Sequence, residues 1–269
     1  MARKNFVFEK MRLGCAIALA LATLIGSTLQ VRSQLTPSVS NSVVAEAQFP
    51  DDGAPTGRRR GGTSRNGCPK LNKDLTALVP GKETWKQVNG KPLLVSESFL
   101  TSTVANRPTF WVYVPELPEN MRAGEFLLQN SAGEDIYKTF LTLPDKPGII
   151  SISLPPDSQY ALETGKRYHW YFKVYCGDPQ QTSDYYFVDA WIERVPLTPA
   201  FESQLKAAKP REYIAYAANN FWYDALSNLS DLRRTDGSNA GLMQDWTDRL
   251  TELELQDLAQ EPIVQRYSF

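Results

Sequence analysis

The chain has 269 residues, and its 29 lysines and arginines nearly balance its 30 aspartates and glutamates. This balance excludes the basic surface expected of a nucleic-acid-binding protein. The single histidine, His169, excludes a zinc site built on several histidines and a proton relay between two of them. With 42% hydrophobic residues the composition is that of a globular protein with a substantial core. We expect no cofactor and no metal.

The amino terminus has the pattern of an export signal. Four basic residues lie within the first twelve positions, and residues 13–25, which follow, carry no charge. This order predicts a signal peptide over residues 1–47, with cleavage after the Ala-x-Ala pattern that ends at Ala47. The apolar run falls short of the roughly 20 residues that span a bilayer. We therefore expect a periplasmic or extracellular protein that contacts the membrane only through the signal peptide before cleavage.

Removal of residues 1–47 leaves a chain with a net charge of −4 and two cysteines, Cys68 and Cys176. In an oxidising compartment an isolated pair of cysteines is most simply interpreted as one disulfide. The alternative is two unpaired thiols. Residues 48–67 are rich in glycine, proline and arginine and predict a disordered linker. We expect the run Arg58-Arg59-Arg60 to be hydrated, although it could also contact anionic lipid or polysaccharide.

Residues 68–198 predict a β-sandwich domain, because short apolar runs alternate with turn signals. The predicted strands cover residues 75–79, 91–95, 109–114, 125–129, 135–143, 149–154, 167–176 and 185–192. Around the start of the seventh of these strands lies a pattern that we associate with such domains. It consists of Leu162 and Gly165 before the strand and Tyr168 and Trp170 within it. The glycine is expected to make a turn, and the two aromatic side chains to anchor the core.

The strand over 167–176 assigns its side chains to two faces, because alternate residues point in opposite directions. Tyr168, Trp170 and Cys176 fall on the core side, whereas His169 points outward and is interpreted as an ordinary surface residue. If this strand pairs with the next, outward aromatic residues gather into a candidate binding face for a protein partner or for sugar rings. This face consists of Tyr171, Tyr175, Tyr185, Phe187 and Trp191.

Residues 199–269 change to a helical period. We predict helices over 199–208 and 210–234 and a further helix that carries Leu242, Trp246 and Leu250. The last two form an α-helical hairpin. The fold class is thus mainly β, an immunoglobulin- or fibronectin-like sandwich followed by an α-helical hairpin. Because the helices need a surface on which to bury their apolar stripes, we expect them to cover the outward aromatic residues.

Several motifs in order resemble a family. They are the Gly/Arg-rich stretch 57–62, Cys68-Pro69, the runs 75–80 and 108–115, Tyr168-His169-Trp170 before Cys176, and residues 221–226. The order resembles an uncharacterised family of exported cyanobacterial proteins that carries a domain of unknown function. The resemblance implies export and supports pairing of Cys68 with Cys176, but it assigns no catalytic residue.

Three functions follow as hypotheses. No catalytic motif is present, so we expect no enzyme but a binding or adaptor protein of the cell envelope, which contacts a protein partner through the helical hairpin or the outer sheet face. The alternative is a carbohydrate-binding module that uses the aromatic face. A third, weaker hypothesis is a carboxylate-dependent hydrolase using Asp184, Asp189 or Glu193, although strand parity puts Asp184 on the opposite face from the other two.

Overall fold

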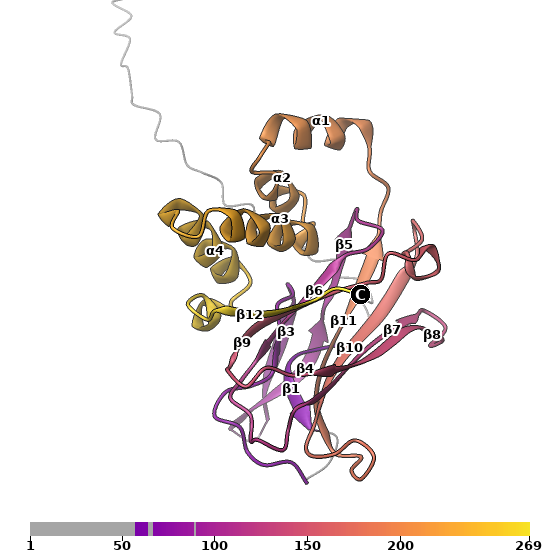
Figure 1. Ribbon diagram of the computed structural model, residues 1–269, viewed down its shortest axis with the longest axis vertical. Helices are drawn as coiled ribbons and strands as arrows, with labels where there is room; N and C mark the ends of the chain where they lie inside the picture. The colour runs from indigo at the N-terminus through magenta and orange to yellow at the C-terminus, as the bar shows by residue number, and fades with distance from the viewer. Residues whose placement is uncertain (1–56, 64–66, 89) are drawn as a thin grey trace, which may run out of the picture. The chain divides into compact units, whose positions relative to one another are not determined.

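The computed structural model describes residues 57–63, 67–88 and 90–269 (Figure 1). The predicted signal peptide over 1–47 lies outside these residues, as do residues 48–56 and 64–66 of the predicted linker.

The described strands form one large sheet and one hairpin. The 10-stranded sheet has the order β12-β9-β6-β2-β1-β11-β10-β7-β8, and β5 pairs in parallel with β11 beside β1. β3 and β4 pair with each other in a two-stranded sheet. The strands are β1 (Arg58–Thr63), β2 (Thr76–Ala77), β3 (Lys82–Val88), β4 (Lys91–Ser98), β5 (Leu100–Thr103), β6 (Thr109–Val114), β7 (Ala123–Asn130), β8 (Asp135–Thr142), β9 (Gly148–Ser153), β10 (Arg167–Tyr175), β11 (Tyr185–Arg194) and β12 (Ile263–Tyr267).

The large sheet curls so that β6 and β9 face β7, β10 and β11 across a shared core (Figure 1). Phe110 of β6 and Phe126 of β7 lie with their ring centroids 4.8 Å apart, and Trp170 of β10 lies 5.4 Å from Phe110. None of these three side chains is exposed to solvent. Alternation along β10 places Trp170 and its apolar neighbours in the core, as the sequence pattern indicates.

Each of the eight predicted strands overlaps an observed strand, and the strand over 109–114 has the predicted limits. The predicted turn before β10 is also confirmed. Gly165 has a positive φ of 77°, which a glycine adopts without strain. The backbone N–H of Glu163 donates to Tyr168 Oη at 2.9 Å, so this tyrosine fastens the turn to the core. The sequence pattern missed β1, β3, β5 and β12.

The prediction of a linker over residues 48–67 was wrong for Arg58–Thr63, which form β1 between β11 and β2. Arg59 is 3% exposed, and its Nη1 donates to the carbonyl of Leu253 at 2.6 Å, at the carboxyl end of a helix. Arg60 pairs with Asp257 at 3.0 Å. A guanidinium is well placed at a helix carboxyl end because the carbonyl groups there lack partners within the helix. The arginine run thus ties β1 to the last helix.

The helices are α1 (Pro199–Ala208), α2 (Tyr213–Ala218), α3 (Trp222–Thr235) and α4 (Ala240–Glu252). α1 has the predicted limits, begins with proline in its first turn and is capped by Thr198. The single helix predicted over 210–234 is instead two helices. Asn220 adopts a φ of +60°, a left-handed conformation that asparagine tolerates and that ends α2 before α3 begins.

The helices pack on the face of β6 and β9 that points away from the shared core (Figure 1). Trp111 of β6 meets Trp246 of α4 edge to face, with ring centroids 6.1 Å apart, and Leu229 of α3 belongs to the same fully buried cluster. The expectation that these helices cover the outward aromatic residues of β10 and β11 was wrong. Trp111 and Tyr113 alternate with core residues along β6, so this strand is apolar on both faces and offers the helices a second apolar surface.

Cys68 and Cys176 form the predicted disulfide, with Cα atoms 5.3 Å apart. It fastens the segment before β2 to the end of β10, and Tyr186 adds a hydrogen bond from its hydroxyl to the carbonyl of Pro69.

The structure confirms a mainly β fold with helices in the carboxyl third. An immunoglobulin- or fibronectin-like sandwich is not confirmed, because β1 hydrogen-bonds to strands of both halves and makes them one continuous sheet. No helix in the described part of the chain is both long and apolar enough for a membrane span.

Candidate binding face on the outer side of the sheet

The five aromatic residues of the predicted binding face lie together on the side of β10 and β11 that points away from the shared core. The two strands are antiparallel, and their register pairs Tyr175 with Tyr185, Lys173 with Phe187, Tyr171 with Asp189 and His169 with Trp191. All five aromatic residues are half-buried. We call this surface, continued onto β7, β8 and β1, the outer face.

A histidine cluster occupies one end of the outer face. His169 Nε2 lies 2.7 Å from Asp189 Oδ2, and its Nδ1 lies 2.8 Å from the hydroxyl of Tyr171. A carboxylate only accepts hydrogen bonds, so Nε2 carries the hydrogen. Trp191 stacks on the imidazole at a centroid distance of 4.3 Å. Together, His169, Tyr171, Asp189 and Trp191 make up this histidine cluster.

The interpretation of His169 as an ordinary surface residue was therefore wrong. Its side chain does point away from the core, but only 13% of it is exposed. Neighbouring side chains on the same face enclose it, and pairing across strands, which the sequence of one strand cannot show, brings Asp189 to it. Burial, followed by the charge of Asp189, raises the pKa of Tyr171 above its ordinary value of 10.0, so this phenol keeps its proton at neutral pH.

An acid–lysine cluster occupies the other end of the outer face. Glu125 of β7 is 1% exposed and accepts hydrogen bonds from Lys173 Nζ at 2.7 Å and from Tyr175 Oη at 2.9 Å. Lys138 of β8 lies 3.2 Å from the same carboxylate. Burial alone would raise the pKa of Glu125, but the hydrogen bonds and the charge of Lys173 outweigh it, so the pKa is lowered. Glu125, Lys138, Lys173 and Tyr175 are the acid–lysine cluster.

Cations cover several ring faces of this surface. Arg58 of β1 lies over Phe187 at 5.4 Å, Lys173 over Tyr185 at 5.2 Å and Lys138 over Phe140 at 5.6 Å from the ring centroids. Tyr185 meets Phe187 edge to face rather than in one plane. The outer face is thus an interleaved layer of rings and cations and not a flat aromatic platform.

The rim of the outer face is its most accessible part. Phe140 of β8, at the end of the sheet, is 58% exposed and lies 6.3 Å from the ring of Tyr175. The side chain of Lys138 is 46% exposed, whereas Glu125 and Asp189 are buried beneath the rings. Cationic and apolar groups therefore face solvent, and the carboxylates that balance the cations do not.

The carboxylates proposed for hydrolysis do not form a pair. Asp189 is held by His169, and Glu193 binds Arg167 at 2.8 Å on the same strand pair. Asp184 precedes β11, and its side chain lies against Gly67. Within residues 57–63, 67–88 and 90–269, no group of three or more histidines, cysteines or carboxylates gathers that could hold a metal ion.

Sequence reasoning missed four contributors to the outer face, namely Arg58, Glu125, Lys138 and Phe140. The strand parity of β7 does carry a signal. Glu125 alternates with Phe126 and Leu128, which fill the core, so its outward direction could be predicted. Its partners could not, because they come from β8 and β10.

Comparison with known protein families gives a match over most of the chain. A family model described as Domain of Unknown Function (DUF928) matches residues 60–263, a range that covers both clusters, the disulfide and all four helices. No curated protein matches the chain.

Proposed function

The chain belongs to this family of unknown function, and we propose that it is a binding protein that holds a protein partner on its outer face. The observation that carries the proposal is the accessible rim of rings and cations formed by Phe140, Tyr175, Lys138 and Arg58 on a face that the helices leave uncovered.

The apolar stripes of α3 and α4 are already buried, since Leu229, Trp246 and Leu250 are completely enclosed. These apolar side chains, which the sequence suggested as a contact surface, instead pack the helices against β6 and β9. The outer face is the contact surface that stays available on the sheet.

The character of the outer face favours a protein partner over a sugar. Stacking of a sugar needs open ring faces, but cations lie over Phe187, Tyr185 and Phe140, and His169 stacks on Trp191. Aromatic and arginine side chains are enriched at the centres of protein interfaces, where they supply much of the affinity. Because Lys138 and Arg58 are the cations that the rim presents, we expect the partner segment to carry acidic side chains next to apolar ones.

We further propose that the protein acts outside the cytoplasm, in the cell envelope or beyond it. The disulfide between Cys68 and Cys176 supports this proposal, because structural disulfides persist in oxidising compartments. The basic and then apolar segment at the amino terminus supports it as well.

Affinity capture with matched variants tests the proposal. Phe140→Glu places a negative charge on the rim, and Ile214→Glu makes the same change on α2, where Ile214 is 52% exposed. We expect tagged wild-type protein and the Ile214→Glu variant to retain one protein partner from the envelope fraction of the source cells, and the Phe140→Glu variant to lose it with an unchanged melting temperature. Capture that is equal for all three proteins would contradict the proposal.

Binding to polysaccharide tests the alternative, a carbohydrate ligand. Retention on envelope polysaccharide that Trp191→Ala and Tyr175→Ala abolish without lowering the melting temperature would replace the protein partner by a carbohydrate. A parallel loss of stability and retention would mark both residues as structural.

A further inference from the structure

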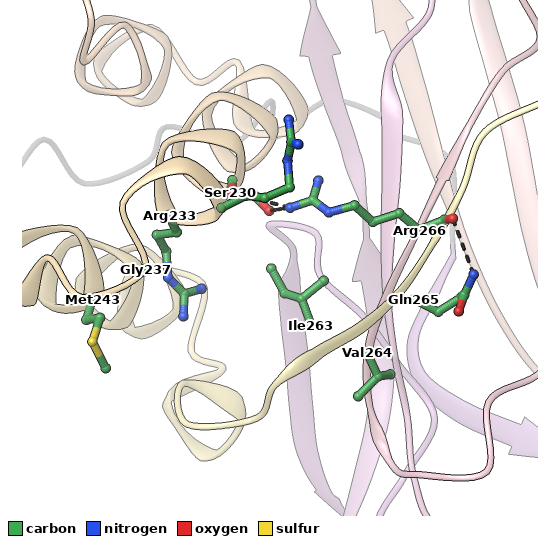
Figure 2. A pocket seen from close by; sticks show the side chains of 9 residues that line it. Ser230, Arg233, Gly237, Met243, Ile263, Val264, Gln265 and Arg266 are labelled. Atoms are coloured by element: carbon green, nitrogen blue, oxygen red, sulfur yellow. Dashed lines mark hydrogen bonds between the residues drawn. The ribbon is translucent and has the colours of Figure 1, made fainter.

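A cavity of about 530 Å³ lies between α3, α4 and β12, on the helical part of the molecule (Figure 2). Its volume is within the range of small-molecule sites. Figure 2 shows Arg233 pointing from α3 into the space that Met243 of α4 and Ile263 of β12 border, while Arg266 reaches from β12 to Ser230 of α3. The walls thus combine basic and apolar side chains.

The charged residues of the walls are all basic. Arg233, Arg234 and Arg266 line the cavity, and no aspartate or glutamate does. Asp231 is the carboxylate in reach, at 3.3 Å from Arg266 and 3.8 Å from Arg234, and its side chain is 58% exposed beside the cavity. One carboxylate against three guanidinium groups leaves an excess of positive charge at the cavity.

Arg233 contributes most to this excess. Within the part of the chain that the structure describes, it has no carboxylate partner, and its Nη1 is buried without a hydrogen-bond acceptor. Its guanidinium lies 4.7 Å from the ring of Trp246, a contact that holds the side chain in place but satisfies none of its N–H donors. Burial, and then the charge of Arg266, lowers the pKa of Arg233. An anion between them would relieve both costs.

Arg266 is held ready for such an anion. Its Nη2 donates to the hydroxyl of Ser230 at 2.5 Å and to the carbonyl of the same residue at 3.2 Å, and its Nη1 donates to the exposed Asp231 Oδ1 at 3.3 Å. Its guanidinium lies 5.5 Å from the centroid of the Trp111 ring. A guanidinium fixed in this way loses little conformational freedom when it binds a ligand.

We propose that this cavity binds a phosphate monoester, with the phosphate between Arg233 and Arg266 and a small apolar substituent against Met243 and Ile263. The net positive charge of the cavity favours a phosphate ligand over a carboxylate ligand, since three guanidinium groups with one carboxylate match a dianion better than a monoanion. Guanidinium groups bind phosphate oxygens through paired N–H donors. The site is separate from the outer face, so each proposal stands without the other.

Calorimetric titration with three probes tests this inference. The full-length protein is titrated with phenyl phosphate, inorganic phosphate and benzoate. We expect saturable binding of phenyl phosphate, weaker binding of inorganic phosphate, which lacks the apolar group, and the weakest binding of benzoate, which carries one charge. If inorganic phosphate binds as tightly as phenyl phosphate, the proposed apolar part of the site is wrong. If benzoate binds as tightly as phenyl phosphate, the choice of a phosphate ligand is wrong.

Variants locate the site. Arg233→Gln is expected to lower the affinity for phenyl phosphate at least about tenfold, as loss of a charged hydrogen-bond donor does. Arg234→Gln, at an exposed side chain of the same cavity, is expected to lower it less, and Arg167→Gln, a control at the outer face, is expected to leave it unchanged. An absence of saturable binding to the wild type, or an affinity that neither cavity variant lowers, would overturn the proposal. Because the side chain of Arg234 is 64% exposed, that variant keeps the test valid even if Arg233→Gln perturbs α3.

Discussion

His169 Nε2 lies 2.7 Å from Asp189 Oδ2, across the pair of strands that carries the outer face. The two residues are not direct partners in the register, since His169 lies opposite Trp191 and Asp189 lies opposite Tyr171. The hydrogen bond therefore runs diagonally and ties two neighbouring cross-strand pairs into one cluster. It turns the single histidine of the chain from an independent surface group into a fixed part of a half-buried layer.

Replacement of Asp189 tests the rigidity of that layer. Asp189→Ala leaves the nearly buried Nε2–H of His169 without its acceptor, and we expect a loss of about 1–3 kcal/mol in the free energy of unfolding. Asp145→Ala is the control, because the side chain of Asp145 is 94% exposed although it also contacts a basic residue. Urea denaturation measures both variants. A loss no larger than that of the control would show that the diagonal bond contributes nothing to stability.

The acid–lysine cluster predicts a loss of stability in acid. The pKa of Glu125 is lower in the folded chain than its ordinary value of 4.5, so the folded state favours the carboxylate more than the unfolded state does. The resulting stabilisation is present above pH 4.5 and is lost as the pH falls through the lowered pKa. We expect Glu125→Gln to be less stable than the wild type at pH 7 and the difference to shrink towards pH 3. A difference that stays constant over this range would contradict the assignment.

Asp224 predicts the opposite dependence on pH. It lies in the first turn of α3, where its Oδ2 accepts a hydrogen bond from Thr103 at 2.7 Å, and burial raises its pKa from 3.8 to about 6. Between these values the folded chain binds the proton more tightly than the unfolded chain, so this group makes stability fall as the pH rises from about 4 to about 6.

Asp224→Asn removes this titration. We expect the stability of the variant relative to the wild type to improve by up to about 3 kcal/mol between pH 4 and pH 7, whatever the difference at pH 4. Denaturation curves at both pH values measure it. Parallel pH profiles for the two proteins would show that Asp224 ionises freely in the folded chain.

Helix α4 provides a matched pair of aliphatic residues. Leu250 is 0% exposed in the cluster between the helices and β6, whereas Met243 is 47% exposed on the same helix. We expect Leu250→Ala to lower the free energy of unfolding by about 2–5 kcal/mol and Met243→Ala by less than about 1 kcal/mol. Similar costs for both would mean that α4 does not pack on the sheet as described.

Local patterns predicted much of this fold, and contacts between distant segments account for what they missed. The short apolar run over residues 109–114 and the alternation over 167–175 determined both strands. β1 escaped prediction since its stability comes from Arg59 and from its pairing with β11, neither of which local composition reveals. The division between α2 and α3 depends on one residue, Asn220.

Strand parity alone predicted the five aromatic residues of the outer face. It did not predict the side chains that enclose them. Parity gives the side of the sheet to which a residue points. It cannot tell which side the helices choose, because both β6 and β11 offer apolar groups on their outward sides. The helices pack on β6, on whose outward side Trp111 and Tyr113 are buried against them.

Site-specific photo-cross-linking in the source cells tests whether the outer face holds a protein partner. A photoreactive phenylalanine analogue replaces Phe140 on the rim in one strain and Ile214 on α2 in another, two exposed apolar positions on different surfaces. If the outer face holds a protein partner, we expect a discrete cross-linked protein from position 140 and none from position 214. No product from position 140, or the same product from both positions, would contradict it.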